Sequence, residues 1–260
     1  MKIARLLGID INVHWSWLIL FLILVYSTSG YYSGWGLKEG REEPIGWLFG
    51  MVGALLLFAS VLVHELAHSL MAKSFGIEVH SISLFLFGGV SDLEVDDATP
   101  RQEFFITIVG PVSSAVLSGI FFLGLYIAGT AGFGFLGGGE FSYFITLLAV
   151  YLAVMNAAIV VFNILPAFPL DGGRVLVSIL EWGGIKKVTA TKIAVYTSYF
   201  LCFALAMLGL YLVVLKGDYS GAWLMVVSVF VLFMARNGMR EARRQNMVVS
   251  EKFIEYLEQK

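Results

Sequence analysis

Long apolar runs dominate the chain. A helix needs about 20 mostly apolar residues to cross the hydrocarbon core of a bilayer, which is roughly 30 Å thick. Six stretches meet or nearly meet this length, and the last of them is short: residues 11–29, 45–72, 103–129, 141–165, 191–215 and 219–235. The pattern predicts an all-α polytopic membrane protein with six transmembrane helices.

A different period appears between the second and third stretches. In residues 79–87 the apolar Ile82 and Leu84 alternate with Ser81 and Ser83. A period of two is typical of a strand with one buried face. We therefore expect a short membrane-associated β-strand or hairpin between helices 2 and 3.

Composition agrees with a membrane protein. Hydrophobic residues make up 58% of the chain and charged residues only 14%, whereas soluble domains carry about 25% charged residues. The net charge of −2 offers no electrostatic footprint for nucleic acid. The one cysteine, Cys202, excludes an internal disulfide and a cysteine-rich metal cluster.

The distribution of positive charge predicts the orientation. Fourteen of the 17 lysines and arginines lie on one side of the predicted spans, and three lie on the other side. By the positive-inside rule both termini are cytoplasmic, and we expect the cell membrane. Residues 1–235 would form one transmembrane domain and residues 236–260 a helical cytoplasmic tail. The first apolar run is longer than a signal-peptide core, so we interpret it as an uncleaved helix.

The second apolar stretch contains His64, Glu65 and His68. Histidines four residues apart lie about 40° apart around a helix, so both imidazoles can converge on one Zn²⁺. Glu65 lies on the neighbouring flank, within reach of a metal-bound water. The alternative is a pair of histidines that make only interhelical hydrogen bonds. Three ionisable groups within five residues of a membrane helix are costly, however, unless they bind something.

A catalytic zinc site takes three protein ligands and keeps one position open. The candidates for the third ligand are His14, His80 and Asp171. Asp171 has the better context, because Pro166 and Pro169 precede it and end a helix. We expect the two glycines after it to allow a sharp return of the chain.

The predicted topology supports Asp171. The spans 45–72 and 141–165 both run towards the cytoplasm, so the histidine pair and Asp171 fall at compatible depth, roughly 8–14 Å below the cytoplasmic face. We expect His14, beside Trp15, to anchor the first helix at the interface. His80 is expected to be structural or exposed to solvent.

These motifs resemble the site-2 protease family, whose members are zinc metalloproteases that cut inside membranes. The resemblance covers about residues 10–185. It rests on H-E-x-x-H at residues 64–68 and on N-x-x-P-x-x-P-x-D-G, which begins at residue 163. Residues 13–17, 87–90 and 110–111 also resemble family landmarks. Because no accessory nucleotide-sensing or peptide-binding domain is recognisable, we expect a compact six-helix member.

The resemblance implies a metalloendopeptidase that hydrolyses peptide bonds within or near transmembrane segments of membrane-anchored proteins. One Zn²⁺ per chain, bound by His64, His68 and Asp171, would activate a water, with Glu65 as general base. Asn163 would contact the substrate or the developing oxyanion, although an interhelical polar contact is an equal alternative. The partners would be transmembrane protein substrates and membrane lipid, with no nucleic acid.

Several alternatives remain open. The strand at residues 79–87 could present an edge that pairs with an extended substrate, or it could only pack against the helices. A catalytically silent relative that binds membrane proteins is the main functional alternative, and a metal transporter is a weaker one. The oligomeric state and the identity of the substrate stay open.

Overall fold

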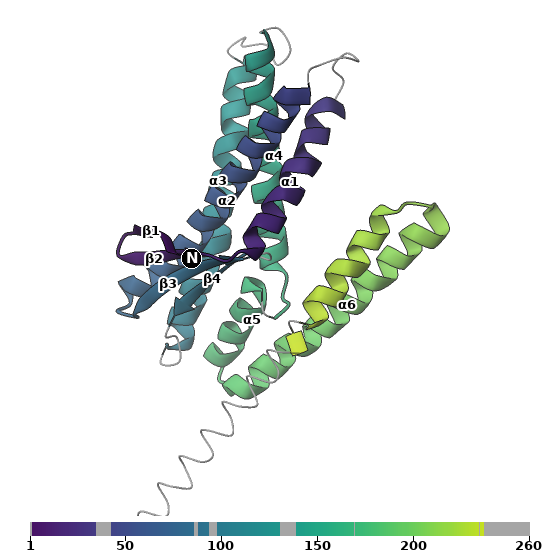
Figure 1. Cartoon of the computed structure of the whole chain (residues 1–260). Helices are drawn as coiled ribbons and strands as arrows, with labels where there is room; N and C mark the ends of the chain where they lie inside the picture. The colour runs from purple at the N-terminus through teal and green to yellow at the C-terminus, as the bar shows by residue number, and fades with distance from the viewer. Residues whose placement is uncertain are drawn as a thin grey trace, which may run out of the picture. The chain divides into compact units, whose positions relative to one another are not determined.

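The computed structural model describes residues 2–34, 43–85, 88–93, 98–130, 139–168, 170–233 and 235–236. Helices form most of the described chain, and four strands lie within its first 93 residues (Figure 1). In chain order the elements are β1 (Lys2–Leu6), β2 (Ile9–Val13), α1 (Ser16–Gly34), α2 (Glu43–Ser74), β3 (Val79–Phe85), β4 (Gly88–Leu93), α3 (Pro100–Thr130), α4 (Gly139–Ile164), α5 (Asp171–Trp182), α6 (Lys187–Lys216) and a final helix, Ser220–Phe233.

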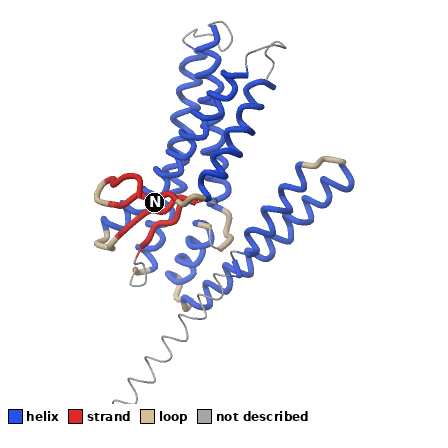
Figure 2. The backbone as a smooth tube through the Cα atoms, viewed as in Figure 1, coloured by secondary structure: helices blue, strands red, loops and turns tan. Residues whose placement is uncertain are grey.

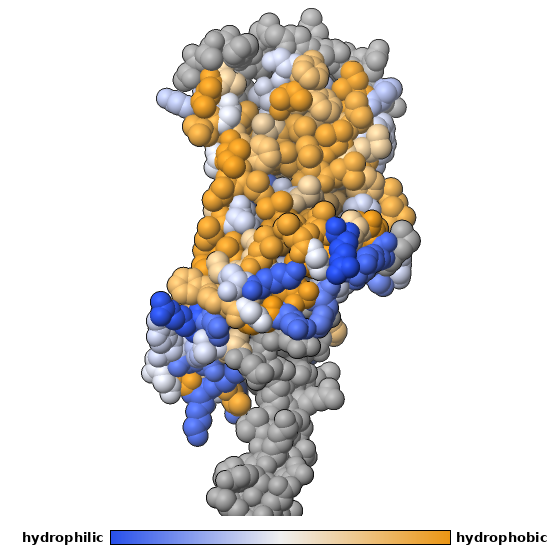
Figure 3. Space-filling view, turned by 90° about the vertical axis from the view of Figure 1, so that its left-hand side faces the viewer, coloured by the Kyte–Doolittle hydropathy of each residue, from blue (hydrophilic) through white to orange (hydrophobic). Residues whose placement is uncertain are grey.

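Four helices are long and apolar enough to cross a membrane. They are Pro44–Ser74, Pro100–Gly129, Phe141–Ile164 and Lys187–Lys216, and they correspond to the second to fifth predicted spans. Hydrophobic residues cover much of the face drawn in Figure 3. Large apolar side chains such as Leu123 and Phe203 are more than half exposed, as expected of surfaces that face lipid rather than water. The chain is therefore an integral membrane protein.

The helices found at the first and last predicted spans differ from them in their bounds. Residues 11–13 belong to β2, and α1 begins only at Ser16. Within the described residues, the apolar helices Ser16–Gly30 and Ser220–Phe233 are shorter than the four long spans. In residues 9–13, apolar and polar positions alternate, which is the period of a strand, but the apolar run that follows masks this signal. Six crossings therefore stay a prediction.

The four strands form one sheet in the order β1-β2-β3-β4 (Figure 2). β1 pairs antiparallel with β2, β2 pairs parallel with β3 from Asp10↔Ser81 to Val13↔Leu84, and β3 pairs antiparallel with β4. The strand expected at residues 79–87 is present as β3, and residues 86–87 lie outside the described residues. The described chain is mostly helical, as predicted, but it contains a four-stranded sheet where the prediction had only a strand or hairpin. Of the two alternatives left open for this strand, a free edge that pairs with substrate is contradicted, because β2 and β4 occupy both of its sides. The outer strands of the described sheet are β1 and β4.

The chain divides into two compact units. The first comprises Met1–Asp97 and Val109–Val161 and the second Ala98–Ile108 and Phe162–Lys260. In the first unit an apolar core joins α1, α2 and α4 through Tyr32, Phe49, Leu57, Leu147, Leu148, Tyr151 and Leu152. In the second unit, α5 packs against α6 around Val177, Ala190 and Ala194. Residues 237–260 lie outside the described residues, so the helical tail stays a prediction.

Candidate metal centre

The two histidines of the sequence motif converge on α2. Their ring centroids are 4.9 Å apart, and the ring planes meet at 80°. His64 is 4% exposed and His68 is 7% exposed, so neither imidazole is a surface group. The helical period that predicted this pair is realised, because residues i and i+4 share a face of the helix.

A serine on α3 orients the first histidine. The Oγ of Ser114 and the Nδ1 of His64 are 2.9 Å apart and form a buried hydrogen bond, and Ser114 is completely buried. When one ring nitrogen is held in this way, the rotation of the imidazole is set and the other nitrogen becomes the one that faces a ligand. This hydrogen bond assigns Nε2 of His64 to that role.

A glycine on α3 explains how both imidazoles fit. Gly110 lies one turn before Ser114 on α3. A Cβ placed on Gly110 would overlap Nε2 and Cε1 of His68, and it would lie 2.8 Å from Nε2 of His64. Both Nε2 atoms therefore face the backbone at Gly110, and any side chain at this position would displace the rings. The landmark at residues 110–111 thus has a steric reason: only glycine lets α3 approach the histidine pair this closely.

Glu65 follows His64 directly on α2 and is half-buried. One residue turns the helix by about 100°, so the carboxylate lies on the flank of the face that carries the histidines. This is the placement that the sequence predicted for a group that exchanges a proton with a water at the metal.

Asp171 is the first residue of α5 and is half-buried. An acidic group in the first turn interacts favourably with the helix dipole. The expected loop return after Asp171 is wrong, because Gly172 and Gly173 are already helical. A Cβ at Gly172 would overlap the carbonyl oxygens of Ile164 and Leu165. The glycine therefore permits close packing of α5 against the broken end of α4, rather than a sharp turn.

The other candidate residues have separate places. Asn163 is half-buried in the last turn of α4. His14 precedes α1, and its Nδ1 lies 2.8 Å from the Oγ of Ser16. His80 is exposed on β3. The structure thus brings His64 and His68 together within the first unit, whereas Asp171 and Asn163 belong to the second.

The comparison with known families agrees with these motifs. Residues 52–147 and 139–205 match the model of Peptidase family M50, and together they cover more than half of the chain. The chain belongs to peptidase family M50. The matched region contains both histidines, Glu65 and Asp171, so the resemblance to site-2 proteases is confirmed.

Three relatives of this M50 chain illustrate how far the similarity extends. This chain is 34% identical to Rip3 of Mycobacterium tuberculosis over 91% of this chain's own length. It is 36% identical to sll0528 of Synechocystis over 94% of its own length. It is 30% identical to the zinc metalloprotease MJ0392 of Methanocaldococcus jannaschii over 92%. The chain spans only 58–60% of the length of these relatives.

Among solved structures, the M50 chain resembles the site-2 protease from Methanocaldococcus jannaschii. The TM-score is 0.58 at 27% sequence identity, and the match covers 92% of this chain and 94% of the other. The fold therefore agrees with the family that the sequence motifs indicate.

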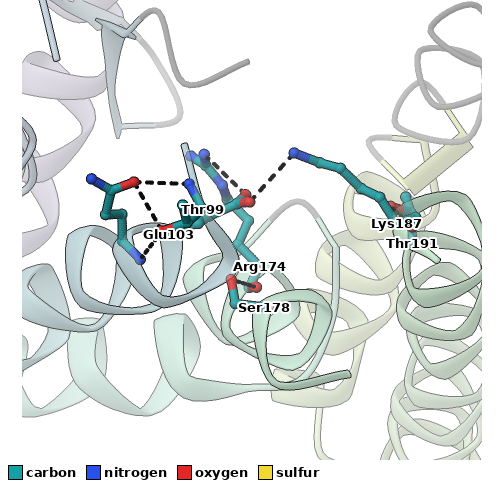
Figure 4. Close-up of polar contacts among 7 residues, drawn as sticks. Thr99, Glu103, Arg174, Ser178, Lys187 and Thr191 are labelled. Atoms are coloured by element: carbon teal, nitrogen blue, oxygen red, sulfur yellow. Dashed lines mark hydrogen bonds and ion pairs between the residues drawn. The ribbon is translucent and has the colours of Figure 1, made fainter. Parts of the chain in front are cut away.

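The structure also shows a charge cluster around a buried glutamate that sequence reasoning missed (Figure 4). Glu103 on α3 is 7% exposed, and it lies 3.6 Å from Arg174 on α5 and 3.5 Å from Lys187 on α6. Arg174 is one turn after Asp171, so this cluster ties the first turn of α5 to its neighbours. The sequence offered one weak signal for this cluster. Glu103 begins the third predicted span, and the connection between the fourth and fifth predicted spans is rich in lysine and arginine.

Two further features surround Glu103. Thr99 and Gln102 form a capping box at the start of α3, in which the Thr99 amide donates to Oε1 of Gln102 over 2.9 Å. Burial raises the pKa of Glu181 on α5, and the charge of Glu103 adds to this effect, whereas Lys187 opposes it. At Glu181 the effect of the Lys187 charge is thus larger than that of the Glu103 charge, and burial sets the upward direction of the pKa.

Proposed function

We propose that this chain is an intramembrane zinc metallopeptidase that hydrolyses peptide bonds within or near transmembrane segments of membrane-anchored proteins. The observation that carries the proposal is the buried pair His64 and His68. Ser114 and the bare backbone of Gly110 set the orientation of their rings, and Glu65 is the next residue on the same helix. Membership of family M50 and the site-2 protease fold support the same conclusion.

His64, His68 and Asp171 are the proposed ligands of one zinc ion per chain. Together they offer two imidazole nitrogens and one carboxylate oxygen. Zinc accepts such nitrogen and oxygen donors, and three protein ligands leave the open position that a catalytic site requires. The relative MJ0392 is named a zinc metalloprotease, which supports zinc as the metal.

Zinc at this site would supply a Lewis acid that makes water acidic enough to attack at neutral pH and that polarises the scissile carbonyl. Glu65 acts as the general base: its carboxylate takes a proton from the attacking water and later passes it to the leaving amine. Asn163, with its neutral amide, donates a hydrogen bond to the substrate or to the developing oxyanion. An interhelical contact is the alternative role of Asn163.

The distribution of lysines and arginines supports a site near the cytoplasmic face. Lysines and arginines favour one side of the spans by 14 to 3, which supports cytoplasmic termini and six crossings in the cell membrane. Lipid contacts the apolar outer faces of the helices, and single-span membrane proteins are the proposed substrates.

The test is zinc content and cleavage measured on the same purified protein. Wild type should bind one zinc per chain and cleave members of a panel of single-span substrates. Glu65→Gln should retain zinc and lose cleavage, because the amide cannot accept the proton of the water. Appreciable turnover by purified Glu65→Gln would refute the role of Glu65.

The second candidate is a catalytically silent relative that binds membrane proteins. It predicts that zinc-loaded wild type binds single-span proteins but cleaves none of them. The complete set of His64, Glu65, His68 and Asp171 argues against it, because binding alone does not require a general base beside the metal ligands.

A further inference from the structure

A short non-helical segment connects α4 to α5 in the second unit. α4 ends at Ile164 and α5 begins at Asp171, so residues 165–170 set the place of the proposed third ligand. Pro166 cannot continue the hydrogen-bond ladder of the helix. Backbone amides that follow such a break need other partners, because unpaired backbone groups are costly in a membrane protein. The partners of this segment therefore decide where Asp171 lies.

A serine of α6 pairs with the backbone of this segment. The Phe168 amide donates a hydrogen bond of 2.8 Å to Oγ of Ser198, and Ser198 is completely buried. The Ser198 hydroxyl itself donates to the carbonyl of Ala194 in α6 over 2.8 Å. A helical serine often bonds back to the i−4 carbonyl in this way. Ser198 does so and also accepts from a residue 30 positions away, which links α6 to the segment before α5.

The first turn of α5 contacts the same peptide unit. A Cβ placed on Gly173 would lie 2.5 Å from the amide nitrogen of Phe168 and 2.6 Å from the carbonyl carbon of Ala167, which is closer than real Cβ atoms approach. Gly173 therefore packs directly on the peptide that joins these two residues. The Leu170 amide donates to the Ala167 carbonyl over 2.8 Å, so the turn just before Asp171 closes on this peptide as well.

Apolar packing holds the segment against the same helix. Ala167 is completely buried and lies in a cluster with Cys202 of α6 and Val231 of the final helix. Cys202 is one turn after Ser198, so one face of α6 offers both the apolar contact and the hydroxyl. The side chain of Leu170, at the N-cap of α5, makes no capping hydrogen bond. The direction of the first turn of α5 thus depends on the contacts of the segment before it.

We propose that Ser198 is a positioning residue for the metal site. It holds the peptide between Ala167 and Phe168, and this peptide sets the place of Gly173 and of Asp171 in the same helical turn. The inference rests on the proposed function and deepens it, because it adds a residue of α6 to a site whose proposed ligands lie on α2 and α5. A serine that only stabilised the second unit would leave the metal affinity unchanged.

The first test measures the zinc Kd of the whole chain by competition with a chelator. Ser198→Ala removes the acceptor of the Phe168 amide, and we expect the Kd to rise about tenfold, the lower end of the range for residues that orient metal ligands. Ser228→Ala is the matched control. Ser228 is also a buried serine of the second unit, but its hydroxyl donates to the carbonyl of Met225 in its own helix. The control should keep the Kd of wild type. An unchanged Kd in Ser198→Ala would overturn the inference.

A double-mutant cycle shows whether the effect passes through Asp171. In the Asp171→Asn background, Ser198→Ala should change the zinc Kd less than about twofold, because residues that act as one unit are not additive. An undiminished tenfold effect in that background would overturn the positioning role. Co²⁺ bound in place of zinc gives a second readout, since its visible absorption reports the ligand geometry. This absorption should change in Ser198→Ala but not in Ser228→Ala, and identical spectra would count against the inference.

Gly173→Ala displaces the same peptide by sterics and leaves Ser198 intact. We expect the zinc Kd to rise at least about tenfold. Gly183→Ala is the control at the other end of α5, where φ is −75° and a Cβ would make its nearest contact at an ordinary 3.4 Å. Equal affinities for the two variants would overturn the coupling between this peptide and the site.

These measurements separate the inference from the proposed function. If wild type binds zinc but cleaves none of the single-span substrates, the proposed function fails alone, and the zinc Kd values still decide the role of Ser198. If wild type and Ser198→Ala bind zinc equally and both cleave, the inference fails alone.

Discussion

The Ser114 hydroxyl lies 2.9 Å from Nδ1 of His64 and is completely buried beside it. The two residues are 50 positions apart on different helices, so this hydrogen bond links the orientation of an imidazole on α2 to the placement of α3. The histidine motif therefore depends on a second helix for its geometry.

Removal of this hydroxyl should weaken metal binding. Loss of an outer-shell partner typically costs about 10–100-fold in metal affinity, so we expect Ser114→Ala to raise the zinc Kd by that factor. Competition with a chelator measures the Kd. Ser118→Ala is the matched control, because its hydroxyl is also buried but donates to the carbonyl of Ala153 on α4. Equal zinc affinities for the two variants would contradict a positioning role.

Gly110→Ala should damage the site by sterics alone. The added methyl group would overlap the imidazole of His68 and crowd that of His64, so at least one ring must rotate away. We expect zinc content below about a tenth of that of wild type, as for loss of a ligand. Gly119→Ala on the same helix is the control, since a Cβ there meets nothing within 4 Å. A fully metallated, active Gly110→Ala protein would show that the helices separate without cost.

Asp171→Asn tests the third ligand. The amide keeps the size of the side chain but removes the negative charge that zinc prefers in an oxygen ligand, so the zinc Kd should rise more than about 100-fold, above the range for outer-shell partners. Cleavage should be lost at ordinary zinc concentrations. Asp218→Asn, on an exposed carboxylate, serves as the control for charge. Unchanged zinc affinity in Asp171→Asn would exclude Asp171 from the ligand set.

The Glu103 cluster should stabilise the second unit. Glu103→Gln leaves Arg174 and Lys187 without their carboxylate, which we expect to cost about 1–3 kcal/mol, because Glu103 itself is buried while both cations are partly exposed. Thermal unfolding in detergent should show a lower Tm. Glu78→Gln, at an exposed position, should leave the Tm near that of wild type. If Lys187→Gln in the Glu103→Gln background lowers the Tm as much as it does alone, the pair does not interact.

The sequence predicted the parts that depend on local periodicity. Apolar length located the four long helices, and the spacing of His64 and His68 placed both rings on one face of α2. The alternation of residues 79–85 predicted β3. Each of these signals lies within one element, so no knowledge of neighbours was needed.

The same reasoning failed where an element is defined by its partners. Residues 9–13 alternate as a strand should, but a continuous apolar run follows them. Their pairing with β3 shows them to be β2. Together with the pairing to β4, it excludes the alternative of a free edge on β3. Gly172 and Gly173 suggested a sharp return because glycine permits one, whereas their actual reason is the proximity of the end of α4.

The residue order by itself determined the membrane character, the pairing of His64 and His68 on one helix face and the family, because apolar length and the spacing of two histidines are local properties of a chain. Only the tertiary structure decided which nitrogen of His64 faces the site, why residue 110 has no side chain, and that Glu103 lies between two cations. These properties arise when segments distant in sequence approach within hydrogen-bonding or van der Waals distance, and a linear pattern does not specify that approach.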